Sequence, residues 1–472
     1  MARTPVVEQR SIDRIPESER HGTARSLFFL WFAANTSITA VVTGALFVLL
    51  GNTAMWAIPA AILGNIAGAF VTSLHSVQGP RLGVPQMIQS RAQFGFHGAT
   101  LPLFLALLIY LGFYATGLVL GGQAMGSLLH VSDGAGAVIF AVFSTVLAVF
   151  GYRYIHRFSH LATVLSAVAI LGLLLRVLIS PVGGPLFSDS SFDLPAFILG
   201  ISLAASWQLT FGPYIADYSR YLPSTTPQLR TFGWTFLGSV IGGSLAMVLG
   251  ALVAEMGGTA FSEHQVAYLA GLGGPFATVV LIAVLAGKLT GNTLSSYGGY
   301  MSVATILTSF TGRDRVSPRA RALLICCISL AALAIALPAS ADFVANFTNF
   351  LLFLLYFMTP WSAINLVDYY LVRRERYDID SLFTPTGKYG RFSGPAFLAY
   401  GLGVLCQIPF ISSDLYTGPI AKAMGGAEVA WLLGIIISGG LYFVLTRRIR
   451  LTVGEEIRAE ARTSAAPTTA GA

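Results

Sequence analysis

Charged side chains are scarce in this sequence. They make up 10% of its 472 residues, whereas about 25% is usual for a soluble protein. So few charges cannot cover the water-exposed surface of a chain this long, which excludes a soluble multidomain enzyme. Hydrophobic residues make up 55% of the chain, and its mean hydropathy is +0.71. This composition is typical of a polytopic helical membrane protein, in which each span needs about 20 apolar residues.

Cysteines are also few, and familiar catalytic motifs are missing. Cys326, Cys327 and Cys406 lie in apolar runs without zinc-ligand or disulfide spacing, so we interpret them as packing residues. No HExxH, GxSxG or P-loop motif occurs, which argues against an enzyme and against an ATP-driven pump. A channel would need a repeated filter or a charged ring, and neither is seen. A secondary transporter without a cofactor remains, with a membrane-embedded enzyme as the weaker alternative.

Apolar runs between polar segments predict twelve membrane spans. The tenth run contains Pro360, which predicts a kink or a tilt. Residues 79–98 are too polar and too short to span, and the tail after Arg450 has the composition of a disordered segment. The predicted spans are 26–50, 54–74, 99–122, 134–150, 159–180, 194–215, 232–255, 275–300, 320–337, 343–371, 393–411 and 427–446.

Basic residues favour the same count. All but three of the 28 Lys and Arg residues fall in the terminal segments or in alternate loops, on one side of the membrane if there are twelve spans. The exceptions are Arg176 and Lys288, inside spans, and Lys422, in an opposite loop. Because basic residues collect in cytoplasmic loops, we expect a multi-pass plasma-membrane protein with both ends in the cytoplasm. The net charge of +7 therefore indicates no nucleic-acid partner, and the expected partners are the lipid bilayer and a small molecule.

Two predicted spans contain helix-breaking residues. Four polar residues, Asn35, Thr36, Ser37 and Thr39, interrupt the first span, and Gly212–Pro213 lies inside the sixth. Matching breaks in spans one and six are what an inverted repeat of five plus five helices produces, and transporter sites lie at such breaks. The expected domains are a terminal segment (1–25), two repeats (26–180 and 194–372), two accessory helices (393–446) and a cytoplasmic tail (447–472).

The eighth predicted span carries a lysine among polar residues. Lys288 lies near the middle of the run, and Thr290, Asn292 and Ser296 follow it. An ionisable group at this depth costs about 2.5–3.5 kcal/mol on insertion scales and is functional by default. We therefore interpret Lys288 as part of a site rather than as a lysine that reaches to the membrane surface.

Flat apolar faces and amides occur together in these spans. Three rings suit stacking on a flat ligand: Phe113, Tyr114 and Trp207. Three amides can donate and accept at its edge: Asn35, Gln208 and Asn292. This combination predicts a planar heterocycle as substrate. At the end of the sixth span, Asp217 and Arg220 are predicted to form a structural ion pair or a gate.

Several segments resemble the purine–cytosine permeases of the nucleobase:cation symporter-1 family. The resemblance implies an all-α, leucine-transporter-like fold with ten core helices in two inverted repeats plus two further helices. It implies substrates such as cytosine, purines, uracil, allantoin, hydantoins or related vitamins. The similar segments occur in order at 12–32 (IDRIPESERHGTARSLFFLWF), 83–95 (GVPQMIQSRAQFG), 121–123 (GGQ), 213–223 (PYIADYSRYLP) and 368–374 (DYYLVRR).

The resemblance also implies roles for single residues. The third-span aromatic, usually tryptophan, matches Phe113, and the polar residue four positions later matches Gly117, whose side chain cannot hydrogen-bond. The sixth-span aromatic matches Trp207, and the eighth-span asparagine matches Asn292. The first-span break matches Asn35. The substrate-binding residues predicted in total are Asn35, Phe113, Tyr114, Trp207, Gln208, Asn292 and Ser296.

The coupling ion is predicted from the same comparison. Sodium-coupled relatives ligate the ion with first-span carbonyls and two eighth-span hydroxyls, which match Thr290 and Gly291. Glycine supplies no hydroxyl, so our hypothesis is that Lys288 replaces sodium, with Thr290 and Thr36 beside it. We therefore predict proton-coupled import of a nucleobase-like heterocycle by alternating access. The alternative is sodium-coupled transport of allantoin, a hydantoin or a vitamin-like heterocycle.

Overall fold

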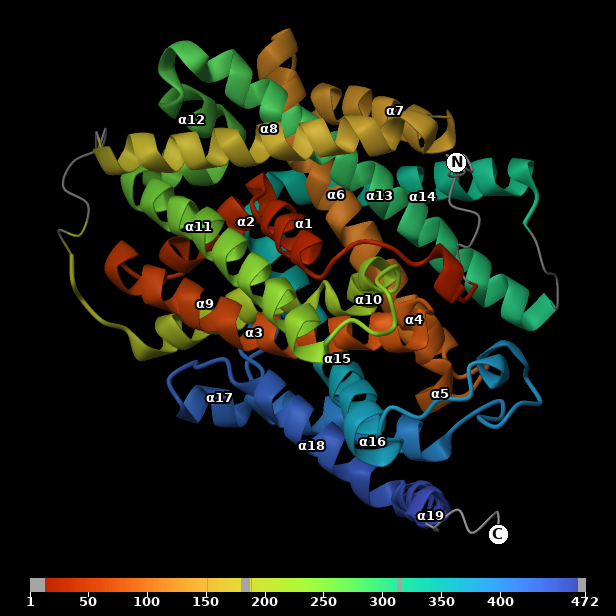
Figure 1. The fold of residues 1–472 in the computed structure, drawn as a ribbon. Coiled ribbons are helices and arrows are strands. Elements are labelled where there is room, and N and C mark those ends of the chain that lie inside the picture. Colours follow the sequence, from red (N-terminus) through yellow and green to blue (C-terminus); the bar gives the residue numbers. More distant parts are fainter. Residues whose placement is uncertain (1–12, 151, 180–186, 188, 312–315, 466–472) are drawn as a thin grey trace, which may run out of the picture.

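The computed structural model describes residues 13–150, 152–179, 187, 189–311 and 316–465. Within these ranges the chain is helical, and its only β pairing is an isolated bridge between Ser412 and Thr417. The all-α prediction is therefore confirmed. Figure 1 shows α1, α2 and α11 in the middle of the bundle, α7 and α8 across one side, and α16 to α19 across the other.

The bounds of the elements follow in chain order. The α-helices are α1 Arg25–Asn35, α2 Ile38–Leu49, α3 Ala54–Leu82, α4 Gln86–Gln89, α5 Arg91–Phe94, α6 Thr100–Leu129, α7 Asp133–Phe150, α8 Tyr152–Ile179, α9 Leu194–Leu209, α10 Ile215–Ser219, α11 Gln228–Glu263, α12 Gln265–Leu272, α13 Ala277–Thr311, α14 Pro318–Ala339, α15 Phe343–Val367, α16 Gly394–Gln407, α17 Pro419–Ala423, α18 Ala430–Leu445 and α19 Arg447–Ala465. The shorter turns are η1 Glu17–Glu19, η2 Gly212–Tyr214, η3 Gly274–Phe276, η4 Ser340–Asp342, η5 Asp368–Val372, η6 Asp380–Phe383 and η7 Ile408–Phe410.

All twelve predicted runs fall on helices. By length and hydropathy alone, seven helices of the described residues can cross a membrane, or up to nine if each bent pair counts as one span. The difference has two sources. The ninth and tenth predicted spans are counted together over Pro318–Val372, and the helical stretches Asp133–Val149 and Gly394–Phe410 are shorter than the other spans.

Both predicted helix breaks are present. α1 ends at Asn35 and α2 begins at Ile38, with a bend of 58° between them. The hydroxyl of Ser37 accepts from the Ala40 amide and so caps α2. In the sixth span α9 ends at Leu209, and the chain passes through the 3-10 turn η2 before α10 begins. Polar side chains that cap a new helix in the first break, and a proline in the second, account for these positions.

Small residues let the central helices approach closely. α3 packs along α9, where a Cβ atom at Gly64 would collide with the Ile201 carbonyl and one at Gly68 with the Ala205 carbonyl. α11 packs along α1, α2 and α3, and α13 packs along α6. These glycines, four residues apart on one face of α3, therefore let the two helix backbones come into close contact. The broken first span therefore packs mainly on α11 and the broken sixth span on α3, and α2 also packs on α9.

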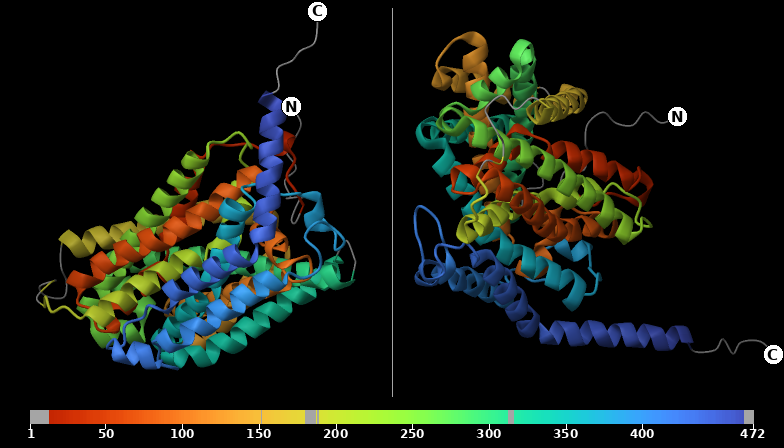
Figure 2. Two further views of the ribbon diagram at one scale, coloured as in Figure 1. Left: turned by 90° about the horizontal axis from the view of Figure 1, so that it is seen from below. Right: turned by 90° about the vertical axis from the view of Figure 1, so that its left-hand side faces the viewer.

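Two predictions about the polar segments need correction or refinement. The tail after Arg450 was expected to be disordered, but α19 continues to Ala465 and projects away from the bundle (Figure 2); residues 466–472 lie outside the described part of the chain. Ile449 and Val453 are four residues apart and so share one face of the helix, whereas Arg447, Arg448 and Arg450 are charged, as in an amphipathic helix at a surface. The segment between the second and third spans forms two one-turn helices, α4 and α5, whose side chains are buried.

Candidate functional site

Two aromatic rings from different helices meet beside the breaks. Phe113 of α6 meets Trp207 of α9 edge to face, with ring centroids 5.7 Å apart and planes at 86°. Phe113 also packs edge to face on Phe350 of α15, at 5.3 Å. Trp207 is buried, and it lies in the last turn of α9, directly before the break. The structure thus brings the predicted residues Phe113 and Trp207 together as an aromatic wall between α6, α9 and α15.

The predicted amides of the two broken helices bond to each other. Oδ1 of Asn35 accepts from Nε1 of Trp207 at 2.8 Å and from Nε2 of Gln208 at 2.9 Å. Nε2 of Gln208 also donates to Oδ1 of Asn65 at 2.6 Å, and Nδ2 of Asn35 donates to the Trp31 carbonyl at 2.9 Å. Asn35 is therefore satisfied within the protein and joins α1 to α9. Oε1 of Gln208 is buried without a hydrogen-bond partner, so it can accept from a ligand.

A face of α13 brings further unpaired groups to the same place. Oδ1 of Asn292 lies so close over Gly117 that a Cβ atom there would collide with it. Nδ2 of Asn292 and Oγ of Ser296 are buried without partners, and residues four apart share a helix face. Gly117 follows Phe113 by one turn of α6, so Asn292 lies beside the aromatic wall. Because buried polar groups are nearly always paired, these atoms mark a place where a ligand can supply the partner.

Lys288 reaches from α13 to the break in the first span. Its Nζ donates to the hydroxyl of Thr39, which lies in the first turn of α2 and is buried. The amine therefore lies at the N-terminal end of a half-helix, the positive end of the helix dipole. Thr39, named in the sequence only as part of the interrupting polar cluster, is the residue that meets the lysine.

The other predicted coupling-ion residues are not grouped with Lys288. Thr290 lies two residues after Lys288 on one helix and therefore points to another face; its hydroxyl is buried without a partner. The Thr36 hydroxyl donates back to the Phe32 carbonyl of its own helix, at 2.7 Å. The structure thus brings Lys288 to Thr39, and the coupling-ion role of Thr290 and Thr36 stays a prediction.

Tyr114 lies away from the aromatic wall. Its ring is fully buried, and its hydroxyl lies 2.9 Å from Oγ of Ser329 in α14 and 3.4 Å from Oγ1 of Thr145 in α7. Consecutive residues of a helix point about 100° apart, so Phe113 and Tyr114 cannot both face Trp207. Tyr114 joins α6 to α7 and α14, and the structure does not bring it to the aromatic wall.

Asp217 and Arg220 tie α10 to neighbouring segments. Oδ1 of Asp217 accepts from the backbone N–H of Gln86 at 2.7 Å. Nε of Arg220 donates to the Asp217 carbonyl at 3.3 Å, and Nη1 donates to the Asp13 carbonyl at 3.1 Å. These bonds fit the structural reading of the two residues, and they also place them where the segments would separate if this end of the bundle opened.

Tyr214 was missed by the sequence analysis. It follows Gly212–Pro213 and stacks on Tyr110 of α6, with ring centroids 5.5 Å apart and planes at 29°. Phe211 lies between it and Trp207, at 6.0 Å from Tyr214 and 5.6 Å from Trp207. A row of rings therefore continues from the aromatic wall toward α10. An aromatic residue directly after the helix-breaking proline was the available signal.

Two fully buried acids outside this region were not predicted as site residues. Asp368, at the start of the π-helical turn η5, accepts from Nε of Arg373 at 3.0 Å, Nε2 of Gln93 at 2.9 Å and the Tyr442 hydroxyl at 2.9 Å. It therefore joins the short helix α5 to α18. Glu428 lies before α18 and has no cation among its bonding partners.

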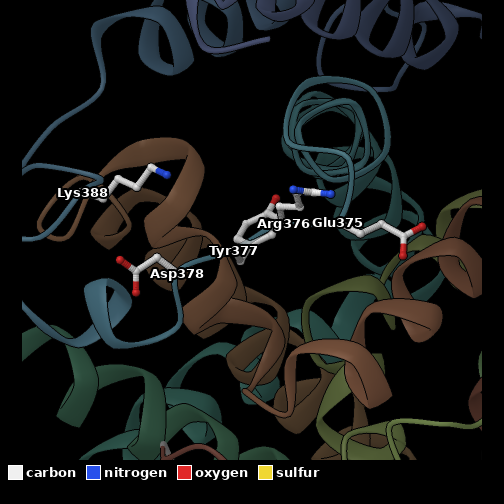
Figure 3. A pocket seen from close by; sticks show the side chains of 5 residues that line it. All are labelled: Glu375, Arg376, Tyr377, Asp378 and Lys388. Atoms are coloured by element: carbon white, nitrogen blue, oxygen red, sulfur yellow. The ribbon is translucent and has the colours of Figure 1, made fainter. Parts of the chain in front are cut away.

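A surface cavity of about 420 Å³ lies in the connection between α15 and α16. It is lined by Glu375, Arg376, Tyr377, Asp378 and Lys388. Figure 3 shows Lys388 and Asp378 at one side of this opening and Glu375 pointing away from them. None of the predicted site residues lines it, and its mixture of exposed charges does not suit a flat, neutral ring.

The first and sixth spans are both interrupted, buried amides join them, and unpaired polar atoms lie beside this joint. Such an arrangement is typical of membrane transporters whose substrate site lies at broken helices. Among the described residues, no three His, Cys, Asp or Glu side chains are grouped to hold a metal ion. A family profile described as permease for cytosine/purines, uracil, thiamine and allantoin matches residues 14–434. The chain belongs to this permease family, as its motifs predicted, and it is a transporter rather than an enzyme.

Curated relatives and solved structures agree with this assignment. YxlA of Bacillus subtilis, provisionally named a purine-cytosine permease, is 39% identical over 93% of this chain and 96% of its own. The purine-cytosine permease fcyB of Emericella nidulans is 25% identical over 93% of this chain and 88% of its own. The inward-facing structure of Mhp1 matches with a TM-score of 0.76 at 18% identity, over 96% of each chain. This last likeness confirms the leucine-transporter-like fold.

Proposed function

We propose that the chain imports a nucleobase-like planar heterocycle, such as cytosine or a purine, by alternating access and in symport with protons. The observation that carries the proposal is the group of unpaired polar atoms beside the Phe113–Trp207 wall. Oε1 of Gln208 can only accept, Nδ2 of Asn292 can only donate, and the Ser296 hydroxyl can do either. A bound ring must therefore present both an N–H group and an acceptor at its edge.

The relatives support this substrate class. Cytosine, purines, uracil and allantoin, named for the family, and bromovinylhydantoin, bound in a Mhp1 structure, all carry N–H groups and acceptors on one ring. Their rings are flat or nearly flat, as the aromatic wall requires. The bound hydantoin is also the observation that favours the substrate of the alternative, allantoin or a hydantoin.

Lys288 supports proton coupling over sodium coupling. A sodium ion about 4 Å from the ammonium group would be repelled by about 4 kcal/mol at an effective dielectric constant of 20. The bond to Thr39 places this amine beside the break of the first span, where sodium-coupled relatives hold their ion. The amine itself can carry a proton, with the Thr39 hydroxyl as acceptor.

The substrate is tested by thermal-shift measurements on the purified protein with cytosine, adenine, hypoxanthine, uracil, allantoin and pyridoxine. We expect a nucleobase to raise the melting temperature and pyridoxine to have no effect. Stabilisation by allantoin alone would favour the alternative.

Coupling is tested by uptake of the stabilising compound into proteoliposomes, with sodium replaced by choline across a pH series. We expect uptake to follow the proton gradient and to be indifferent to sodium. Lys288→Met should abolish the dependence on the proton gradient, whereas Lys422→Met, which removes an exposed lysine, should not. Sodium stimulation without any effect of the pH gradient would refute proton coupling.

A further inference from the structure

Glu428 is an acid enclosed by the protein on all sides. It lies in the connection between α17 and α18, at the end of the bundle opposite to α19 (Figure 2), and it is 0% exposed. Its Oε2 accepts from the Tyr356 hydroxyl at 2.7 Å and from the Ser412 amide at 2.6 Å. Its Oε1 accepts from the Ala430 amide at 2.9 Å. All three donors are neutral.

Within the described part of the chain, no cation is bonded to this carboxylate. Tyr356 is the titratable side chain that faces it from α15, and α9, α18 and the 412–417 segment present only Ser202, Trp431 and backbone amides. The nearest charged residues along the surrounding segments are exposed and belong to Asp193, Asp414 and Lys422. Removing an unpaired carboxylate from water is costly, and the usual outcome is that it takes up a proton.

The protonation state of Glu428 therefore changes near neutral pH. Burial raises the pKa of Glu428 to about 7, against the lowering effect of its three hydrogen bonds. Around neutral pH the carboxyl therefore passes from mostly protonated to mostly ionised. A surface glutamate would stay ionised throughout this range.

The residue is also tied to the helix that carries the aromatic wall. The Ser202 hydroxyl of α9 donates to the backbone carbonyl of Glu428 at 2.8 Å, and Nε1 of Trp431 donates to the same hydroxyl at 3.0 Å. Trp207 lies little more than one turn further along α9. Glu428 thus joins three elements: α9 through its carbonyl, α15 through Tyr356 and α18 through Ala430.

We propose that Glu428 is a proton-binding site whose occupancy sets how firmly α15 is held to the accessory helices. The ionised carboxylate accepts three hydrogen bonds. A protonated carboxyl must donate one, so the bond with Tyr356 reverses, and the tyrosine proton loses its acceptor. This site is separate from the Lys288–Thr39 pair, and the inference holds whichever heterocycle is carried.

The proton site is tested first without substrate, by melting temperature between pH 5 and pH 9. The pKa of Glu428 is higher in the folded protein than in the unfolded chain. At pH values between the two, the folded protein keeps a proton that the unfolded chain has lost. Stability relative to Glu428→Gln should therefore fall as the pH rises from 5 to 7 and stay level above pH 8. Tyr356→Phe removes a donor to the carboxylate and should move this step to higher pH. Glu255→Gln is the matched control, since Glu255 also accepts a helix-start amide, from Ala54 at 3.1 Å, and this variant should keep the wild-type step.

The link to the helices is tested by initial uptake rates at external pH 6 and pH 8. We expect the rate to change less between the two values in Glu428→Gln than in the wild type, because the variant keeps only the dependence on the proton gradient that Lys288 supplies. A flat melting-temperature difference from pH 5 to pH 9 would overturn the proton site. A melting step with an unchanged pH profile of uptake in Glu428→Gln would overturn the link to α15. Failure of every compound to be taken up would count against the proposed function, while the melting step would still decide the proton site.

Discussion

Trp207 offers a sharp test of the aromatic wall, because its ring and its indole nitrogen can be removed separately. Trp207→Phe keeps a flat ring and loses the 2.8 Å bond to Asn35. Oδ1 of Asn35 still accepts from Gln208, so no buried acceptor is left without a hydrogen bond. The free energy of unfolding should therefore fall by only about 1 kcal/mol. The smaller ring weakens stacking on a ligand by up to about 1 kcal/mol, which is about fivefold in Kd.

Trp207→Ala removes the ring as well. The side chain is 4% exposed and packs on Phe113 and Phe211, so its truncation should destabilise the fold by about 3–5 kcal/mol. A flat ligand loses both its stacking partner and the apolar surface that covers it. We expect a loss of about 2 kcal/mol in binding, or about thirtyfold in Kd.

The assay is equilibrium binding of the compound that stabilises the wild type, with the melting temperature recorded in parallel. Trp56→Phe is the matched control, because Nε1 of Trp56 donates one bond, to the Ser190 carbonyl at 3.2 Å, away from the wall. Its affinity should equal that of the wild type. Unchanged affinity in Trp207→Ala, or equal weakening in Trp56→Phe, would refute the assignment of Trp207 to the site.

Three further substitutions test other parts of the structure. Gly117→Ala places a Cβ atom against Oδ1 of Asn292. We expect this to displace the amide and to raise the Kd about tenfold in the same binding assay. Unchanged affinity would contradict the contact. Tyr114→Phe should lower the melting temperature through the loss of one buried hydrogen bond, about 1 kcal/mol, and should leave Kd unchanged, since a raised Kd would return Tyr114 to the site. Asp368→Asn leaves Arg373 buried without its ion-pair partner and should destabilise the protein by about 3–5 kcal/mol. A melting temperature close to that of the wild type would show that the ion pair is not needed for stability.

The sequence could predict the features that depend on local chemistry. A proline in an apolar run and a cluster of small polar residues both disturb a helix wherever they occur, so the breaks near Asn35 and at Gly212–Pro213 were predictable. The same holds for Lys288, because a charge in the middle of an apolar span needs an explanation in any fold. The neighbourhood of Phe113 and Trp207 came from the family resemblance rather than from spacing.

The features that the sequence could not place depend on helical phase and on distant partners. Tyr114 follows Phe113 in sequence, yet a step of about 100° turns it to α7 and α14. Thr290 shares the polar stretch of Lys288 and points elsewhere for the same reason. Glu428 gave no local signal at all, because its burial is created by residues that lie far away in the chain, such as Tyr356 and Ser202.

The hydrogen bonds of Asn35 link substrate binding to helix movement. One oxygen atom of Asn35 holds both Trp207 and Gln208, so the joint between the two broken helices is built from the residues that line the proposed site. A ligand that stacks on Trp207 and donates to Oε1 of Gln208 stabilises the arrangement in which α1 and α9 are joined. A ligand shifts a conformational equilibrium only through its different affinity for the two states, and here the same contacts supply that difference. Asn35→Ala should therefore weaken the coupling of substrate to transport rate more than it weakens binding, because it removes the joint and leaves Trp207, Asn292 and Gln208 in place.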